Sequence, residues 1–173
     1  MNIKGLVMKM YKKILVVDDE ARIADTIAYA LKREGFNVEV AYDGESALKK
    51  INNFHPIVLI LDIMMPKLNG YEVIKRIEDR TMIGIIMLTA KSDIVDKILG
   101  LELGADDFIV KPFDMRELTA RVNSLVRRLE KVVVKEALIL GKLKVKIPER
   151  KAMIEGTPLD LTPKEFDLLV ARS

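Results

Sequence analysis

Short apolar runs alternate with segments of helical periodicity from residue 12 onward, and this alternation restricts the fold more than any other feature. The apolar runs lie at 14–17, 38–41, 57–61, 85–88 and 108–110. Amphipathic segments follow them at 21–34, 44–51, 71–78, 93–103 and 114–130. Five strand–helix units predict an α/β domain built on a parallel sheet. The nearly unbroken apolar run at 57–61 predicts a central strand buried on both faces.

The pattern changes after about residue 131. Strand-like stretches lie at 132–135, 138–147 and 151–154. With a turn at 156–158 they predict a small antiparallel sheet. A last helix is expected after Thr162, which forms a capping-box pattern with Glu165. The chain stops about two turns later. We therefore expect this second domain to be incomplete and four apolar side chains to lack a covering element: Phe166, Leu168, Leu169 and Val170.

Composition removes several classes of site. The chain has no cysteine and one histidine, which excludes disulfides, thiol catalysis and Cys/His zinc sites but leaves metals bound by oxygen. No apolar run approaches the roughly 18 residues of a membrane span, and no signal peptide is recognisable. We therefore expect a cytoplasmic protein with no membrane partner. The net charge of +3 is too small to indicate nucleic acid binding by itself.

Polar side chains stand where the apolar runs end. Asp18 and Asp19 follow the first run, Asp62 the third, Thr89 the fourth and Lys111 the fifth. Ligands of open α/β sheets bind beyond the carboxyl ends of the strands, so these groups are expected to gather there. A solvated turn with a helix cap would also explain the adjacent aspartates. Neighbouring carboxylates repel unless a cation joins them, and Mg²⁺ fits best because it combines carboxylates with a phosphate.

The same cluster suggests phosphoryl chemistry. The Lys111 ammonium and the Thr89 hydroxyl could bind phosphoryl oxygens, and the central Asp62 could be the nucleophile that forms an acyl phosphate. A phosphatase of the haloacid dehalogenase type is disfavoured, because it needs a second acid where Met64 stands. A nucleotide-binding Rossmann or P-loop enzyme is disfavoured because neither glycine motif follows a strand.

Residues 12–131 resemble a response-regulator receiver domain. The resemblance rests on KILVVDDE at 13–20, LDIMMP at 61–66, MLTA at 87–90, GADDF at 104–108 and KPF at 111–113. It implies a flavodoxin-like, doubly wound sheet of strand order 2-1-3-4-5 and a cis bond before Pro112. It also implies that Asp62 accepts a phosphoryl group from a sensor kinase histidine, while Asp18, Asp19, Asp62 and the Met64 main-chain carbonyl hold Mg²⁺. Such a chain is a phosphoacceptor switch rather than an enzyme, with weak Mg²⁺-dependent self-phosphorylation from small donors and autodephosphorylation allowed.

The resemblance also implies a switch. The phosphoryl group draws in Thr89, and Phe108 turns inward, at a position where the family more often has tyrosine. This reshapes the face of helix four, strand five and helix five, at 93–103, 108–110 and 114–130, through which two copies pair. The implied pairs between copies are Lys97 with Glu117, Asp106 with Arg121, and Asp107 with Arg128. Simple solvated charges are the alternative.

Residues 138–173, joined by a linker at 132–137, resemble the start of the winged-helix effector of OmpR/PhoB-type transcription regulators. The recognition helix and the wing lie outside these 173 residues. We therefore expect no specific DNA binding from this chain, whereas the intact regulator would bind promoter DNA as a phosphorylated dimer. The alternative is a receiver that acts by protein contact without binding DNA.

Overall fold

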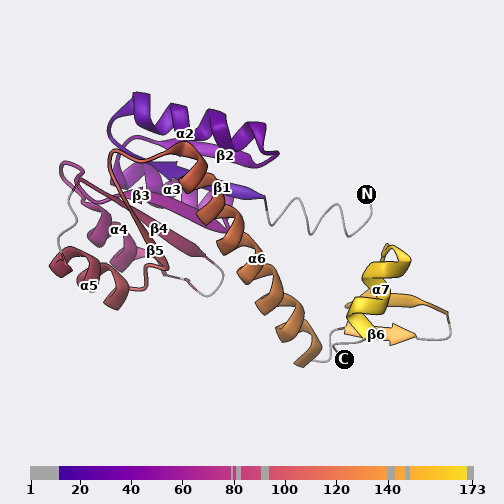
Figure 1. Cartoon of the computed structure of the whole chain (residues 1–173). Coiled ribbons are helices and arrows are strands. Elements are labelled where there is room, and N and C mark those ends of the chain that lie inside the picture. The colour runs from indigo at the N-terminus through magenta and orange to yellow at the C-terminus, as the bar shows by residue number, and fades with distance from the viewer. Residues whose placement is uncertain are drawn as a thin grey trace. The chain divides into compact units, whose positions relative to one another are not determined.

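The computed structural model describes residues 12–78, 80, 83–90, 94–139, 143–146 and 149–170, and they form two compact units (Figure 1). The first unit spans Lys12–Arg127. Its strands are β1 (Lys13–Val17), β2 (Asn37–Ala41), β3 (Val58–Asp62), β4 (Gly84–Thr89) and β5 (Asp107–Val110). Its helices are α2 (Ala21–Arg33), α3 (Gly44–Phe54), α4 (Gly70–Arg76), α5 (Ile94–Glu102) and the first part of α6 (Met115–Ile139). The predicted start of α5 at 93 lies outside the described residues.

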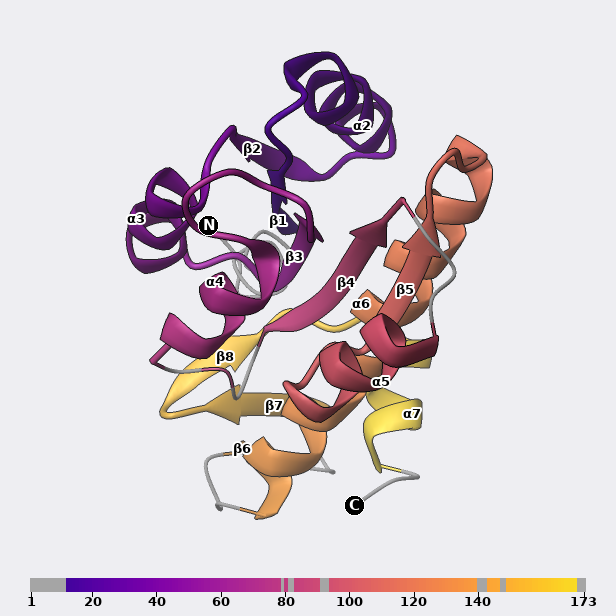
Figure 2. The same cartoon turned by 90° about the vertical axis from the view of Figure 1, so that its left-hand side faces the viewer.

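All five strands of this unit are parallel, in the order β2-β1-β3-β4-β5. Helices α3, α4 and α5 cover one face of the sheet and α2 and α6 the other (Figure 2). Every residue of β3 and β4 is buried, as expected of central strands covered on both faces. The predicted doubly wound α/β fold and its strand order are confirmed.

Local signals end α2 and α5 and begin α6 close to where the sequence predicts, whereas α3 runs three residues past its predicted end at 51, to Phe54. Gly35 adopts a φ of 89° after α2, and Gly104 a φ of 100° after α5, a conformation that glycine adopts at no steric cost. The Asp114 carboxylate accepts the backbone N–H of Arg116 at 2.8 Å and caps α6. The peptide bond between Lys111 and Pro112 is cis, as the resemblance implies.

Three secondary-structure predictions for the C-terminal part are wrong in whole or in part. Residues 132–135 are not a strand, and the strand predicted at 138–147 does not begin at 138, because α6 continues to Ile139. Three successive valines favour a strand, but extending an existing helix needs no new nucleus and each valine costs only about 0.5–0.7 kcal/mol relative to alanine. The turn predicted at 156–158 extends only to Gly156, because Thr157–Leu159 form a third strand. Among the described helices, α6 included, none is both long enough and apolar enough to cross a bilayer.

The second unit holds the small antiparallel sheet β6 (Leu143–Lys146), β7 (Lys151–Ile154) and β8 (Thr157–Leu159), followed by α7 (Pro163–Val170). The predicted strand end at 147 lies outside the described residues. The capping box of α7 is confirmed, since the Thr162 N–H donates to Glu165 Oε2 at 2.9 Å. The prediction that Phe166 lacks cover is wrong: it is only 3% exposed, and the Arg150 guanidinium lies 5.0 Å from its ring centre. The side chains at 168–170, for which the same was predicted, lie outside the described part of the chain.

Candidate functional site

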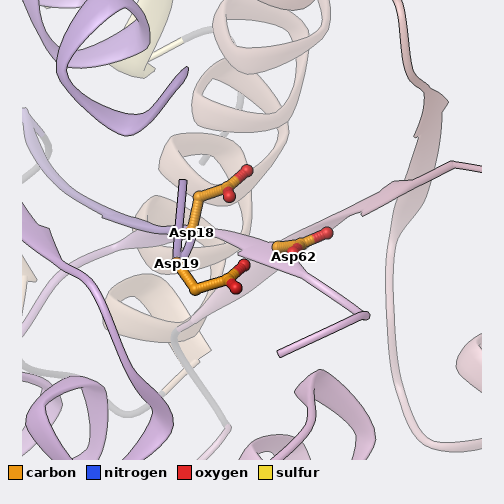
Figure 3. Close-up of side chains that lie close together, drawn as sticks. All are labelled: Asp18, Asp19 and Asp62. Carbon is orange, nitrogen blue, oxygen red and sulfur yellow. The ribbon is translucent and has the colours of Figure 1, made fainter. Parts of the chain in front are cut away.

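Three carboxylates meet at the carboxyl edge of the sheet. Asp18 and Asp19 follow β1, and Asp62 ends the neighbouring β3, with Val17 paired to Leu61 in the register between them. One oxygen from each of the three carboxylates lies within 4.8 Å of the others (Figure 3). Asp18 is fully buried, Asp62 is 4% exposed and Asp19 is exposed, so the cluster opens to solvent on the Asp19 side.

Lys111 supplies the positive charge of the cluster. It follows β5, and its backbone N–H donates to the Thr89 carbonyl at 2.7 Å. The Lys111 Nζ lies 2.7 Å from Asp18 Oδ2 and 3.3 Å from Asp62 Oδ1. Burial acts to lower the pKa of Lys111, but its contacts with Asp18 and Asp62 outweigh burial and raise that pKa. The side chain is therefore charged and held between the two buried carboxylates.

Asp62 has a strongly shifted ionisation. Burial is the main cause that raises the pKa of Asp62 to about 6, and the charge of Asp18 adds to it. Lys111 acts in the opposite direction without cancelling these two effects. At neutral pH the carboxylate is mostly ionised but poorly solvated. A bound cation, or a covalent bond that removes its charge, would therefore stabilise it.

The other predicted site residues differ in exposure. Asp18 is fixed by the backbone, since it accepts the N–H of Glu20 at 2.9 Å and its own N–H donates to the Ala41 carbonyl at 3.2 Å. Thr89 is the last residue of β4 and is 3% exposed. The Met64 side chain is 73% exposed, two residues beyond Asp62. The strand ends thus bring Thr89 to the same edge as the carboxylates, and Met64 stands at its outer margin.

Sequence reasoning missed the part played by Gly70. The helix α4 begins at Gly70, whose N–H donates to the Ile63 carbonyl at 3.0 Å. A Cβ at this position would lie 2.5 Å from the Asp62 carbonyl oxygen and 3.0 Å from the Ile63 Cα. The missing side chain therefore lets the start of α4 pack directly on the backbone of Asp62. The Asn69-Gly70 pair marks a helix start in the sequence, but no sequence signal shows what this helix start touches.

The donor set fits a magnesium ion. Three carboxylates against one ammonium leave the cluster negatively charged, and carboxylate oxygens are the ligands that Mg²⁺ prefers. Asp19 is exposed, so an ion bound there could keep water or phosphate oxygens as its other ligands. The acidic pocket is thus suited to a hard divalent cation together with a phosphate.

Several of the residues predicted to pair between copies have partners within their own chain. Arg121 Nη1 lies 2.8 Å from Asp107 Oδ2, and Arg121 Nη2 lies 2.8 Å from Glu117 Oε1. The Asp106 carboxylate accepts the N–H of Ile85 at 2.8 Å, which ties the start of β5 to β4. Lys97 lies on α5 and Arg128 on α6. These charges therefore lie on α5, β5 and α6 or directly beside them, which is the face predicted to pair and is called the α5–β5–α6 surface below. Arg121 connects Asp107 with Glu117 on this surface.

Comparison with known proteins agrees with this geometry. The family model of the response regulator receiver domain matches residues 14–123. The alkaline phosphatase synthesis transcriptional regulatory protein PhoP of Bacillus subtilis is 45% identical over 171 residues, covering 93% of this chain and 71% of PhoP. The DNA-binding response regulator MtrA of Mycolicibacterium smegmatis is 43% identical over 162 residues, covering 94% of this chain and 71% of MtrA.

Solved receiver domains share the fold of the first unit. The receiver domain of a Francisella response regulator is 38% identical with a TM-score of 0.63, covering 68% of this chain and 98% of that domain. A CheY-like receiver domain protein from Methanospirillum hungatei is 32% identical with a TM-score of 0.66, covering 69% of this chain and 97% of that protein. The chain therefore belongs to the two-component response regulators that carry a receiver domain, and it is homologous to PhoP and MtrA.

Proposed function

We propose that Asp62 is the phosphoryl acceptor of this response regulator and that Asp18, Asp19, Asp62 and the Met64 carbonyl bind Mg²⁺. The observation that carries the proposal is the position of Asp62, which is buried at a strand end beside two further carboxylates and 3.3 Å from the Lys111 ammonium. A bound Mg²⁺ would neutralise the phosphoryl oxygens during transfer.

The chain's own groups have distinct tasks in this transfer. An Asp62 carboxylate oxygen forms a bond to phosphorus while the bond from phosphorus to the donor's histidine nitrogen breaks, and the departing imidazole takes up a proton. Lys111 lies within ion-pair distance of Asp62 and binds a phosphoryl oxygen. The Thr89 hydroxyl binds another. The product is an acyl phosphate, so Asp62 acts once per cycle and must be dephosphorylated before the next transfer.

The phosphoryl donor is proposed to be a sensor histidine kinase, and the regulator is proposed to act in the cytoplasm. A groove beside Lys111, lined by Ile23, Ile27, Pro112 and Phe113, provides a surface on which a donor domain can bind near Asp62. Phosphorylation would draw in Thr89 and Phe108, change the α5–β5–α6 surface and favour a homodimer.

We propose transcription regulation as the output, because the similarity to PhoP and MtrA covers 93% and 94% of this chain and so continues beyond the receiver. The proposed domains are a receiver at 12–131, a linker at 132–137 and an effector portion at 138–173. In the intact regulator the effector would bind promoter DNA. Regulation by protein contact alone is the second candidate.

The phosphorylation proposal is tested by intact mass spectrometry after incubation with Mg²⁺ and acetyl phosphate. We expect one added phosphoryl group on the wild type and none on Asp62→Asn. Asp25→Asn is the matched control, because Asp25 is an exposed carboxylate on α2, hydrogen-bonded to Tyr42 at 2.7 Å. Equal labelling of Asp62→Asn and the wild type would refute the assignment, and omission of Mg²⁺ should abolish labelling.

A further inference from the structure

Helix α5 carries a glycine at the point where it packs on the sheet. Gly100 is buried, and a Cβ at this position would lie 2.2 Å from Cζ and 2.9 Å from Cε1 of Phe108. No real side chain tolerates such distances, so the tip of the Phe108 ring rests on the bare Cα of Gly100. Glycine weakens a helix interior, and this close approach is the physical reason that the position needs it.

The side chains of Phe108 and Thr89 lie on the same face of the sheet. Phe108 pairs with Met87 and Val110 with Thr89 in the parallel register of β4 and β5. Side chains alternate along a strand, so Met87 and Thr89 point to the same face. Phe108 packs against the buried cluster that contains Met87. The ring is therefore placed between α5 and the row of side chains that ends at Thr89.

We propose that Gly100 is the positioning residue that sets the resting place of Phe108 and thereby couples the phosphoryl site to the surface of α5. This inference rests on the proposed function, in which Thr89 moves toward the phosphoryl group and Phe108 follows it inward. The present ring position, between α5 and the sheet, is the inward one, and the missing side chain of Gly100 provides the space for it. When the ring turns outward, α5 loses the contact that holds it at its present distance from the sheet. The helix carries Ile98 and Leu101, which are 51% and 55% exposed, so its movement rearranges an apolar surface.

The Gly100→Ala substitution tests this coupling. The added methyl meets a ring, which can rotate about χ1, rather than backbone. The ring is therefore expected to leave Gly100 and turn outward, so that the inward position is no longer available to it. A state favoured by phosphorylation should in turn favour phosphorylation. Because the substitution removes that state, we expect the rate of labelling by acetyl phosphate and Mg²⁺ to fall by on the order of tenfold, equivalent to about 1.4 kcal/mol.

A double-mutant cycle isolates the contact. Wild type, Gly100→Ala, Phe108→Ala and the double variant are compared for labelling rate and for the midpoint of urea unfolding. Without the ring, the methyl meets nothing at this place, so Gly100→Ala should leave the labelling rate of the Phe108→Ala variant unchanged and raise its urea midpoint through helix propensity. The same change in both backgrounds would overturn the proposal, as would an unchanged labelling rate for Gly100→Ala with Phe108 present.

The two readouts separate this inference from the proposed function. Absence of labelling in every protein, wild type included, would refute phosphorylation at Asp62. The urea midpoints of the four proteins then test only the contact between Gly100 and Phe108. Additive midpoint shifts would overturn that contact. Non-additive shifts would support it, but the coupling to phosphorylation would be refuted together with the proposed function.

Discussion

At the scale of single residues, the cost of ionising Asp62 is the main consequence of the site's geometry. Its pKa is raised from 3.8 to about 6 by burial and then by Asp18. A folded-state pKa above the unfolded one means that the protonated form stabilises the fold. This contribution is complete below about pH 4 and is lost as the pH rises through about 6. The difference between the two pKa values corresponds to at most about 3 kcal/mol.

The Asp62→Asn substitution should therefore stabilise the metal-free protein at neutral pH. The amide keeps the shape of the carboxyl group but never ionises, so the variant should unfold at higher urea than the wild type at about pH 7.5, by up to about 3 kcal/mol. The advantage should vanish near pH 4. Urea unfolding in the presence of a chelator, repeated across this range, measures it.

Saturating Mg²⁺ provides the control for this prediction. The ion would bind the ionised wild-type cluster and stabilise it by mass action, so adding it should narrow or reverse the advantage of Asp62→Asn. Stability curves of the two proteins that run parallel from about pH 4 to pH 8 without metal would contradict the raised pKa of Asp62.

At the scale of elements, the start of α4 determines where the backbone of Asp62 lies. A methyl at residue 70 would meet the Asp62 carbonyl oxygen at 2.5 Å and the Ile63 Cα at 3.0 Å, both of them backbone atoms that cannot rotate away. We expect Gly70→Ala to destabilise the protein by about 1–3 kcal/mol. Because the clash displaces Asp62 itself, labelling by acetyl phosphate should also slow. Urea unfolding and the labelling rate measure the two effects.

Asn69→Ala is the matched control for α4. The Asn69 side chain accepts the N–H of Glu72 at 3.0 Å in a capping box. Its loss should cost about 1 kcal/mol of stability without placing an atom against Asp62. If Asn69→Ala and Gly70→Ala slow labelling equally after correction for the unfolded fraction, the contact with Asp62 has no role of its own.

The sequence predicted elements and strand ends better than contacts between elements. Asp18, Asp62 and Lys111 could be placed together because parallel strands bring their carboxyl ends to one edge. The roles of Gly70 and Gly100 could not be predicted, because each depends on a group from another element. Gly70 packs on the backbone carbonyl of Asp62, and Gly100 packs on the ring of Phe108. The hydrogen bond from Ile85 to Asp106 is equally invisible, since it joins residues 21 positions apart. The strand predicted at 132–135 failed because an adjoining helix outweighed the local preference of three valines.

At the scale of the whole molecule, the proposed dimer has to compete with ion pairs inside each chain. Arg121 already forms ion pairs with Asp107 and Glu117, at 2.8 Å from each. Pairing between copies therefore exchanges one set of partly solvated ion pairs for another, and such pairs are worth only about 0.2–1 kcal/mol each. The exposed apolar residues of α5, Ile98 and Leu101, would have to supply the remaining affinity. Charge would then set which surfaces pair more than how tightly they pair.

Charge reversal at Lys97 and Glu117 separates these contributions. In a dimer with twofold symmetry, Lys97 of each copy would meet Glu117 of the other, so each single reversal places like charges together twice. Lys97→Glu and Glu117→Lys should each weaken the phosphorylated dimer, by about tenfold in its dissociation constant, and the double variant should recover most of the loss. Sedimentation velocity on phosphorylated protein at low salt measures the dissociation constant of the dimer. Lys50→Glu is the control, because Lys50 pairs with Glu39 on β2 at 3.6 Å, outside the α5–β5–α6 surface. Glu117 also forms an ion pair with Arg121 in its own chain, so Glu117→Lys alone could weaken the dimer through that contact. If the double variant dimerises no more tightly than either single variant, the pair between copies does not form.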